Sequence, residues 1–292
     1  DTVDGDTPSI AALLASKGGD GAISLREAIL AVNNTSAGNS PTRIDFAIPG
    51  NGVHTITLGS ALPAIDRPVI IDGTTDSGSF AANGNRPAIV LDGNQANSHG
   101  LTLQAGASGS TVRGLVITDF QLNGIRIEAG SNGNTIVGNY LGKLTAAGVA
   151  GGTGNAQSGL SIYGNDNIVG GSSAQERNVI SGNASNGVYI NGGTGNQVLG
   201  NYIGTDAGGN AANGNQNSGV YLIGGATGNL IADNVIAAST VDGVSINGET
   251  SDGNTVRGNR IGRGADGSTV MGVGQDGLYG SGGEDNQIIG GS

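Results

Sequence analysis

Three of the six tyrosines share one position in a short repeated pattern, and side chains at that position have types that could bind a ligand. The pattern is a glycine followed by an apolar residue, a variable residue and a second apolar residue. When the apolar residues of a strand face a core, alternation turns the residue between them outward. The variable position is held in turn by Arg126, Ser161, Tyr189, Tyr221, Ser245 and Tyr279.

An outward tyrosine offers a flat apolar face and a polar tip, which suits stacking on a sugar ring. Tyrosine is also favoured on strand surfaces without any ligand, so a purely structural role for these tyrosines stays open. If the repeats stack as coils about 4.8 Å apart, Tyr189 and Tyr221 become near neighbours. The sequence thus predicts a ligand-binding stripe that comprises Arg126, Tyr189, Tyr221 and Tyr279.

Side chains suited to acid–base catalysis are few. Glycoside hydrolysis needs two carboxylates that converge on one bond, and the nearest pair, Glu284 and Asp285, falls in a corner beside the chain end. Proton abstraction from a uronate needs a base, with a cation to neutralise the carboxylate. We expect His54 to face outward from a strand and His99 to lie in a corner. The sequence therefore predicts no catalytic residue.

One group of charged residues stands out from the otherwise neutral repeats. Arg126 and Glu128 should both point outward, and Lys143 on the next strand could lie beside them. Asp119 and Tyr140 complete the group. We interpret it as a solvated surface cluster, with a functional site as the alternative.

No cofactor is expected, and calcium is the one candidate metal. The chain has no cysteine, which excludes disulfides, cysteine-bound zinc and thiol catalysis. Asp4 and Asp6 resemble the start of a calcium loop but lack the later ligands. Asp206 lies in a glycine-rich loop, where a turn carboxylate is the ordinary alternative.

The elements that would position these residues repeat along the chain. From about residue 100, the glycine pattern alternates with a second pattern, Asn-x-(Ile/Val)-x-x-Asn, as at Asn134–Asn139 and Asn196–Asn201. Short alternating runs bounded by Gly and Asn are typical of strands, and stacked asparagines can form side-chain ladders. We predict an all-β fold, a right-handed parallel β-helix of roughly ten coils, with the handedness that parallel crossovers favour.

The expected organisation is an N-terminal helical cap over residues 1–42 and a β-helix over residues 43–292. Ser24 and Glu27 have the spacing of a capping box at the start of a helix. Another helix is expected to follow a Thr7 cap, with Pro8 at its first position. Every second coil carries extra residues, after Gly142, Gly204 and Gly262, and we expect these loops to be mobile.

The chain stops in mid-coil at Ser292, which predicts a longer parent protein or end-to-end self-association. Its formal charge of −11 and pI of about 4.3 argue against nucleic acid as a partner. The same charge disfavours anionic membrane surfaces. No apolar run is long enough for membrane insertion.

The segment Gly21-Ala-Ile-Ser-Leu-Arg-Glu-Ala-Ile29 resembles the start of a bacterial extracellular β-helix repeat family that is known by its CSLREA motif. The segments Arg43–Phe46, Ile70–Thr75 and Arg177–Asn183 resemble later parts of that family. One departure is Ile23, which stands where the family has cysteine.

The resemblance implies a secreted, extracellular protein at the cell surface and an adhesin-like structural role, with a polysaccharide or cell-surface glycan as ligand. Parallel β-helices also include polysaccharide lyases, C5-epimerases and glycoside hydrolases that act on extracellular polysaccharides. Such an enzyme is the alternative function, and a self-assembling fibre subunit is a further one.

Overall fold

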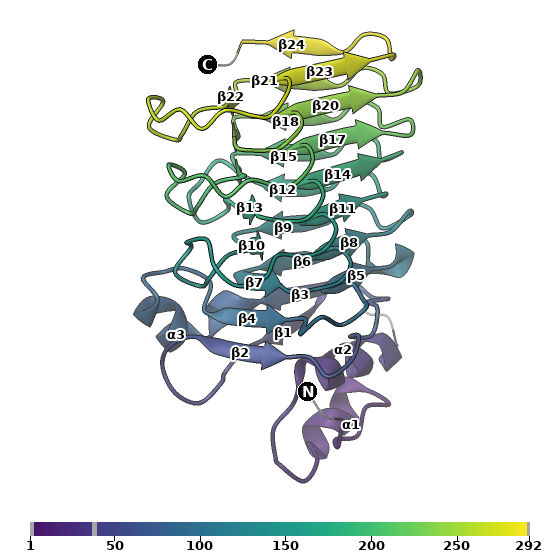
Figure 1. Cartoon of the computed structure of the whole chain (residues 1–292). Helices are drawn as coiled ribbons and strands as arrows, with labels where there is room; N and C mark the ends of the chain where they lie inside the picture. Colours follow the sequence, from purple (N-terminus) through teal and green to yellow (C-terminus); the bar gives the residue numbers. More distant parts are fainter. Residues whose placement is uncertain (1–2, 37–39, 291–292) are drawn as a thin grey trace.

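The computed structural model describes residues 3–36 and 40–290 and shows three parallel sheets that wind around one core (Figure 1). The coils stack from the N-terminal helices at the bottom of the view to the last strand at the top. This arrangement confirms the predicted parallel β-helix, and the nine strands of the largest sheet agree with the expected number of coils.

Each sheet collects one strand from nearly every coil, and all pairings between neighbours are parallel. Sheet A consists of β1 (Thr42–Asp45), β3 (Val69–Asp72), β6 (Thr111–Arg113), β9 (Thr135–Val137), β12 (Ile168–Gly170), β15 (Gln197–Leu199), β18 (Leu230–Ala232), β21 (Thr255–Arg257) and β24 (Gln287–Ile289). Sheet B consists of β2 (His54–Thr57), β4 (Ile89–Asp92), β7 (Leu115–Thr118), β10 (Tyr140–Gly142), β13 (Val179–Ser181), β16 (Tyr202–Ile203), β19 (Val235–Ile236) and β22 (Arg260–Ile261). Sheet C consists of β5 (Leu101–Leu103), β8 (Ile125–Ile127), β11 (Leu160–Ile162), β14 (Val188–Asn191), β17 (Val220–Ile223), β20 (Val244–Asn247) and β23 (Leu278–Ser281).

The core is a column of aliphatic side chains, because every strand turns its alternate residues inward. Ile136, Val169, Val198 and Ile231 form such a column on sheet A and are fully buried. Burying one such side chain contributes roughly 1.5–3 kcal/mol, so the thin core gains its stability from repetition along the axis.

Buried asparagine ladders join the coils at the corners. In one ladder the Asn196 amide oxygen accepts hydrogen bonds from the main-chain N–H and the side-chain amide of Asn167, both at 2.9 Å. Parallel ladders include Asn139–Asn178–Asn201 and Asn155–Asn183–Asn215. The ladder through Asn196 and the ladder through Asn139 and Asn201 confirm the expected ladders. Their hydrogen bonds satisfy polar groups that would otherwise be buried without partners.

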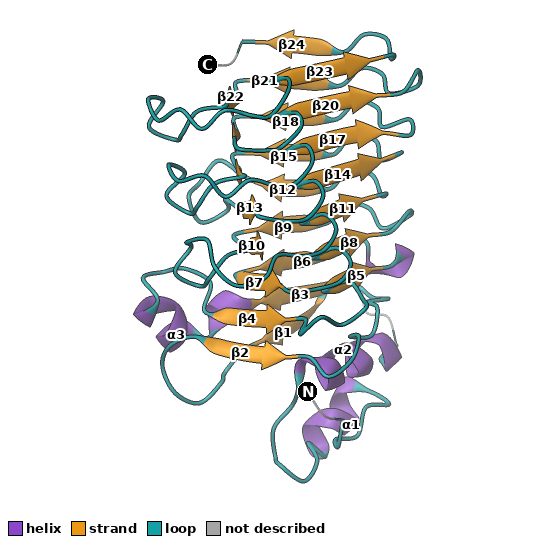
Figure 2. Cartoon of the chain, in the orientation of Figure 1, coloured by secondary structure: helices purple, strands orange, loops and turns teal. Residues whose placement is uncertain are grey.

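Two helices, α1 (Ile10–Ala15) and α2 (Leu25–Asn34), pack against each other at the N-terminal end, and α2 contacts β1 (Figure 2). Ser24 and Glu27 form the predicted capping box. The cap of α1 is Ser9, not the expected Thr7, because the Ser9 hydroxyl accepts the N–H of Ala12. Short helical turns η1 (Gly73–Thr75), α3 (Ser77–Ala82) and η2 (Ala105–Ala107) lie in the early coils.

The three inserted loops lie on one side of the solenoid, to the left in Figure 1. Each folds on itself through an antiparallel bridge, and each contacts the loop two coils away. The N–H of Ala207 donates to Gly148 O at 2.7 Å, and that of Ala265 donates to Gly209 O at 2.9 Å. We call this stack the loop ridge. Its contacts argue against the mobility expected from its composition.

The loop ridge also covers the outer face of sheet B. Tyr140 and Val179 on that face are buried against Leu144 and Ala146 of the first loop. Sheet B is therefore closed to ligands along these coils, whereas the outward face of sheet C has no such cover in the described structure.

Candidate functional site

Two parallel columns of side chains run along the outward face of sheet C. Strand register places Arg126 opposite Ser161, Ser161 opposite Tyr189, and Tyr189 opposite Tyr221. This inner column continues through Ser245 to Tyr279. The outer column lies two residues further along the chain and contains Glu128 and Tyr163, which directly follow β8 and β11, and Asn191, Ile223 and Asn247, which end β14, β17 and β20. We call the two columns together the sheet C face.

Three tyrosines on successive coils form one aromatic array. The ring centroids of Tyr189 and Tyr221 are 5.8 Å apart, as the predicted stacking requires, with planes tilted by 41°. Tyr163 packs its ring edgewise on Tyr189, with centroids 6.2 Å apart and an interplanar angle of 73°. All three rings are half-buried, so part of each stays open to a ligand.

Arg126 closes one end of the array. Its guanidinium carbon lies 4.4 Å from the Tyr163 ring centroid, within cation–π range. Its Nε and Nη2 atoms donate to the two carboxylate oxygens of Glu128, at 2.6 and 3.1 Å. These hydrogen bonds raise the pKa of Arg126 above its ordinary value. The guanidinium is therefore charged, paired and held in a fixed orientation.

Asparagine amides orient the tyrosine hydroxyls. The Asn191 amide donates to the Tyr189 hydroxyl at 2.9 Å, and the Asn247 amide donates to the Tyr221 hydroxyl at 3.1 Å. Burial raises the pKa of Tyr189, so its hydroxyl is protonated at neutral pH. The Asn247 amide also donates to the Ser245 hydroxyl at 3.3 Å. The second N–H of Asn191 and the carbonyl oxygens of both amides give the sheet C face fixed donors and acceptors for a ligand.

Ser161 lies beneath this array and is only 1% exposed. It sits in register between Arg126 and Tyr189, and its hydroxyl has no hydrogen-bond partner among the described residues. The long side chains of the neighbouring coils thus cover a small polar residue, which gives the face a continuous surface.

His99 lies at the turn before β5, close enough to the array for the charges of Arg126 and Glu128 to act on its ring. Its Nδ1 atom accepts the main-chain N–H of Asn123 at 3.1 Å. Burial, followed by the charge of Arg126, lowers the pKa of His99 to about 4. The imidazole is therefore neutral at physiological pH.

The charged group expected around Lys143 does not assemble. Arg126 and Glu128 pair on sheet C, but Lys143 follows β10 and lies at the corner after sheet B. Asp119 contacts Gln95 instead, and burial together with the charge of Asp92 raises the pKa of Asp119. The expectation failed because residues close in sequence were separated by a corner. Tyr279, the last predicted stripe residue, is in register and 41% exposed but has no ring neighbour among the described residues.

A shallow cavity of about 440 Å³ lies between the loop ridge and the turns that lead into sheet C. Sequence reasoning missed it because it spans three coils and the ends of two inserted loops. It has no aromatic wall, and the one charged side chain that lines it is Lys143. Its lining residues are Lys143, Thr153, Gly154, Asn155, Ala156, Gly182, Ala184, Asn213, Gly214 and Gln216.

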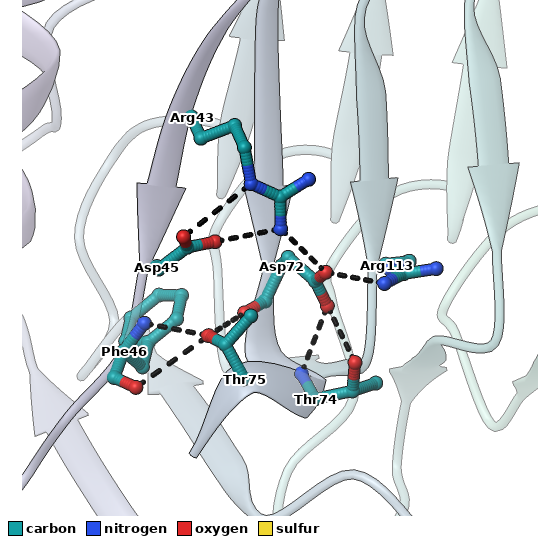
Figure 3. Close-up of polar contacts among 7 residues, drawn as sticks. All are labelled: Arg43, Asp45, Phe46, Asp72, Thr74, Thr75 and Arg113. Atoms are coloured by element: carbon teal, nitrogen blue, oxygen red, sulfur yellow. Dashed lines mark hydrogen bonds and ion pairs between the residues drawn. The ribbon is translucent and has the colours of Figure 1, made fainter. Parts of the chain in front are cut away.

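A second charged cluster lies on sheet A of the first coils and is structural in character (Figure 3). The side chain of Asp72 is fully buried and accepts hydrogen bonds from Arg43, Arg113 and Thr74. Burial by itself raises the pKa of Asp72, but the contacts with Arg113 and Thr74 outweigh it and hold this pKa below its usual value. A carboxylate saturated in this way is unavailable for acid–base catalysis.

His54 does not face outward as expected. It lies on the same side of β2 as Ile56, and its Nε2 atom is 2.9 Å from the Ser79 hydroxyl and 3.7 Å from Asp76. The expectation was wrong because residues two apart on a strand share a face. Ser79 is fully buried and both contacts use the same ring nitrogen, so the three residues do not form a catalytic triad.

The proposed calcium ligands bind main-chain groups. An Asp206 carboxylate oxygen accepts the N–H groups of Asn210 and Ala211, and Asp4 accepts that of Gly19 at 2.9 Å. Asp6 is exposed. Within residues 3–36 and 40–290, no three His, Cys, Asp or Glu side chains gather as a metal-binding group. Calcium binding stays a prediction from the sequence.

A scan against protein-family models matched none of them, and a search of curated proteins found no match. Among solved structures, a double mutant of the periplasmic alginate epimerase AlgG matches with a TM-score of 0.46 and 18% identity, over 79% of this chain and 57% of that chain. AlgG itself matches with a TM-score of 0.45 and 14% identity, over 82% and 58%. The catalytic domain of a GH87 alpha-1,3-glucanase in complex with nigerose matches with a TM-score of 0.29 and 10% identity, over 87% and 67%.

The matches to AlgG thus cover less than two thirds of those chains. At these identities and TM-scores, the similarity does not carry a function over to this chain. None of the three structures is named as an adhesin, so the adhesin-like role expected from the sequence gains no support. Membership of the CSLREA family stays a prediction.

Proposed function

We propose that this protein binds a polysaccharide on its sheet C face. The observation that carries the proposal is the array of Tyr163, Tyr189 and Tyr221 on three successive coils. Half-buried rings lose little conformational freedom when they stack on a ligand, and their hydroxyls and the adjacent amides supply hydrogen bonds to sugar hydroxyls.

The ligand runs along the axis of the β-helix. The three rings lie on successive coils, with centroids 6.2 and 5.8 Å apart, and this arrangement suits an extended chain whose sugar rings contact one coil after another. Arg126 and Glu128 limit the array at one end, and Asn247 continues its polar edge at the other.

The test is retention of the purified chain in gels cast with a panel of soluble polysaccharides. The variant with both Tyr189→Ala and Tyr221→Ala is expected to lose retention while its thermal midpoint stays close to that of the parent. Tyr202→Ala is the matched control, because Tyr202 is also half-buried but lies on sheet B beside Arg177. Equal retention of the double variant and the parent protein would refute the proposal.

A second candidate function is modification of the bound polysaccharide as a lyase, epimerase or hydrolase. It is favoured by the neutral imidazole of His99 at the end of the array that also holds Arg126 and Glu128. The polymer retained in the gel would be incubated with the protein and tested for shortened or epimerised product. If the parent protein forms product, and the His99→Gln variant forms none but is retained equally, the protein is an enzyme whose activity depends on His99.

The extracellular location is part of the proposal, since a polysaccharide ligand and the CSLREA-like segment both suit it. None of the described helices is long and apolar enough to span a membrane. End-to-end self-association stays a separate hypothesis, which sedimentation at increasing protein concentration would test.

A further inference from the structure

The distribution of charge around the tyrosine array limits which polysaccharides can bind there. Of the chain's twelve lysines and arginines, Arg126 is the one that lies on a strand of sheet C. Its charge is already neutralised by the bidentate pair with Glu128, and the Tyr163 ring packs against its guanidinium. The sheet C face therefore offers no unpaired cation to a carboxylate or sulfate group.

The turns that flank sheet C add far more negative than positive charge. Between residues 93 and 286, the segments that lead into or out of its strands contain two cationic side chains, Lys143 and Arg263, and both lie at the inserted loops beside sheet B. They also contain the acidic residues Asp119, Glu128, Asp166, Asp242, Glu249, Asp252, Asp276, Glu284 and Asp285. His99, the other basic group nearby, is neutral at physiological pH because burial lowers its pKa.

A polyuronate carries one negative charge on each sugar, so its carboxylates would face these acidic turns on every coil. Like charges brought together at a binding surface are penalised, and here the chain's net charge of −11 adds to the penalty. The polar groups that the face offers include the hydroxyls of Tyr189 and Tyr221 and the amides of Asn191 and Asn247. These groups suit neutral sugar hydroxyls.

We infer that the polysaccharide bound by the sheet C face is neutral, and that polyuronates such as alginate and de-esterified pectin are rejected. This inference rests on the proposed function, and it names the ligand class for the same site. Of the reactions given for the second candidate function, it is compatible with hydrolysis and not with lysis or epimerisation of a uronate. Lys143 lines the cavity beside the loop ridge and not the sheet C face.

The test compares polymers that differ in charge. Neutral glucan, galactan, mannan and xylan are set beside alginate and beside pectins of graded methyl esterification, with EDTA or with calcium. We expect retention by at least one neutral polymer, little change with salt, and binding to alginate and de-esterified pectin that is weaker by about tenfold or more. Salt-sensitive retention by a polyuronate in preference to every neutral polymer, with or without calcium, overturns the inference but leaves the proposed function standing. No retention by any polymer overturns both.

A gain-of-charge variant tests the same point from the other side. Ile223 is a half-buried outward residue of the outer column, next to Asn191 and Asn247. Ile223→Lys is expected to acquire salt-sensitive retention by de-esterified pectin. Leu230→Lys is the matched control, because Leu230 is a half-buried residue of the same coil on sheet A. An equal gain in both variants would place the polyuronate contact outside sheet C and contradict the inference.

Discussion

Asn201 lies directly beside Asn178 of the preceding coil, and its amide oxygen accepts two hydrogen bonds from that residue. The main-chain N–H of Asn178 donates at 3.1 Å and its side-chain amide at 2.9 Å. Both residues are fully buried. One side chain therefore satisfies two donors that have no access to water, and the same relation is repeated along each ladder.

Replacing Asn201 by alanine leaves the main-chain N–H of Asn178 buried without a partner, and its side-chain amide keeps only the bond to Ile136 O. Each unsatisfied group costs about 1–3 kcal/mol, so we expect Asn201→Ala to lower the free energy of unfolding by about 2–5 kcal/mol. Chemical denaturation followed by circular dichroism measures it. Asn97→Ala, at an exposed asparagine, should change the same quantity by less than about 0.5 kcal/mol. Equal effects of the two changes would contradict this account of the ladder.

Asp72 is expected to stabilise the first coils through its buried carboxylate. Asp72→Ala removes hydrogen bonds from Arg113, Arg43 and Thr74, and each bond to a charged group contributes about 1.5–3 kcal/mol. Because the two arginines are about half exposed and regain water, we expect a net loss of about 2 kcal/mol. Asp45→Ala is the control, since that carboxylate is itself 49% exposed and pairs with Arg43 only, and it should cost under about 1 kcal/mol.

His99 should titrate well below an ordinary histidine. Its pKa is lowered from 6.5 to about 4 in the folded chain, so the unfolded chain binds a proton at a higher pH than the folded chain does. Stability should therefore fall as the pH drops from 6.5 toward 4, and not as it rises. Proton NMR of the His99 ring gives the midpoint, and His99→Gln should remove this part of the pH dependence of the thermal midpoint. A midpoint near 6.5 would show that the ring is not buried as described.

Gly154 is predicted to tolerate no side chain, although it lies in the wall of a surface cavity. A Cβ atom there would meet Gly182 O of the next coil at 2.0 Å, so the coils would have to separate. We expect Gly154→Ala to destabilise the chain by about 1–3 kcal/mol. Gly280→Ala, where a Cβ meets nothing within 4 Å, should be neutral or slightly stabilising. Differential scanning calorimetry of both variants would decide.

The sequence predicted the coils well, because each strand is specified by local features. A glycine that approaches the next coil, one or two inward aliphatic residues and a ladder asparagine recur together, and each can be recognised without its neighbours. Tyr189 and Tyr221 were placed side by side for this reason, since both occupy the same position in the repeat.

The remainder of the site depended on geometry that no local pattern encodes. Tyr163 was missed because it lies in the outer column, four residues after its glycine, where only the strand register shows that it packs against Tyr189 and Arg126. Lys143 was misplaced because the corner after β10 turns the chain away from sheet C. The cavity arises from three coils and the ends of two loops, so it too requires the folded chain.

The loop ridge has a consequence for how such a chain can change in length. Its contacts join Gly148 to Ala207 and Gly209 to Ala265, so the loops outside the β-helix repeat every two coils. The strands of the core repeat every coil. Adding or deleting a single coil would leave the inner core continuous but would pull neighbouring loops out of reach and uncover Tyr140 or Tyr202. Gene duplication within this chain is therefore expected to proceed in pairs of coils.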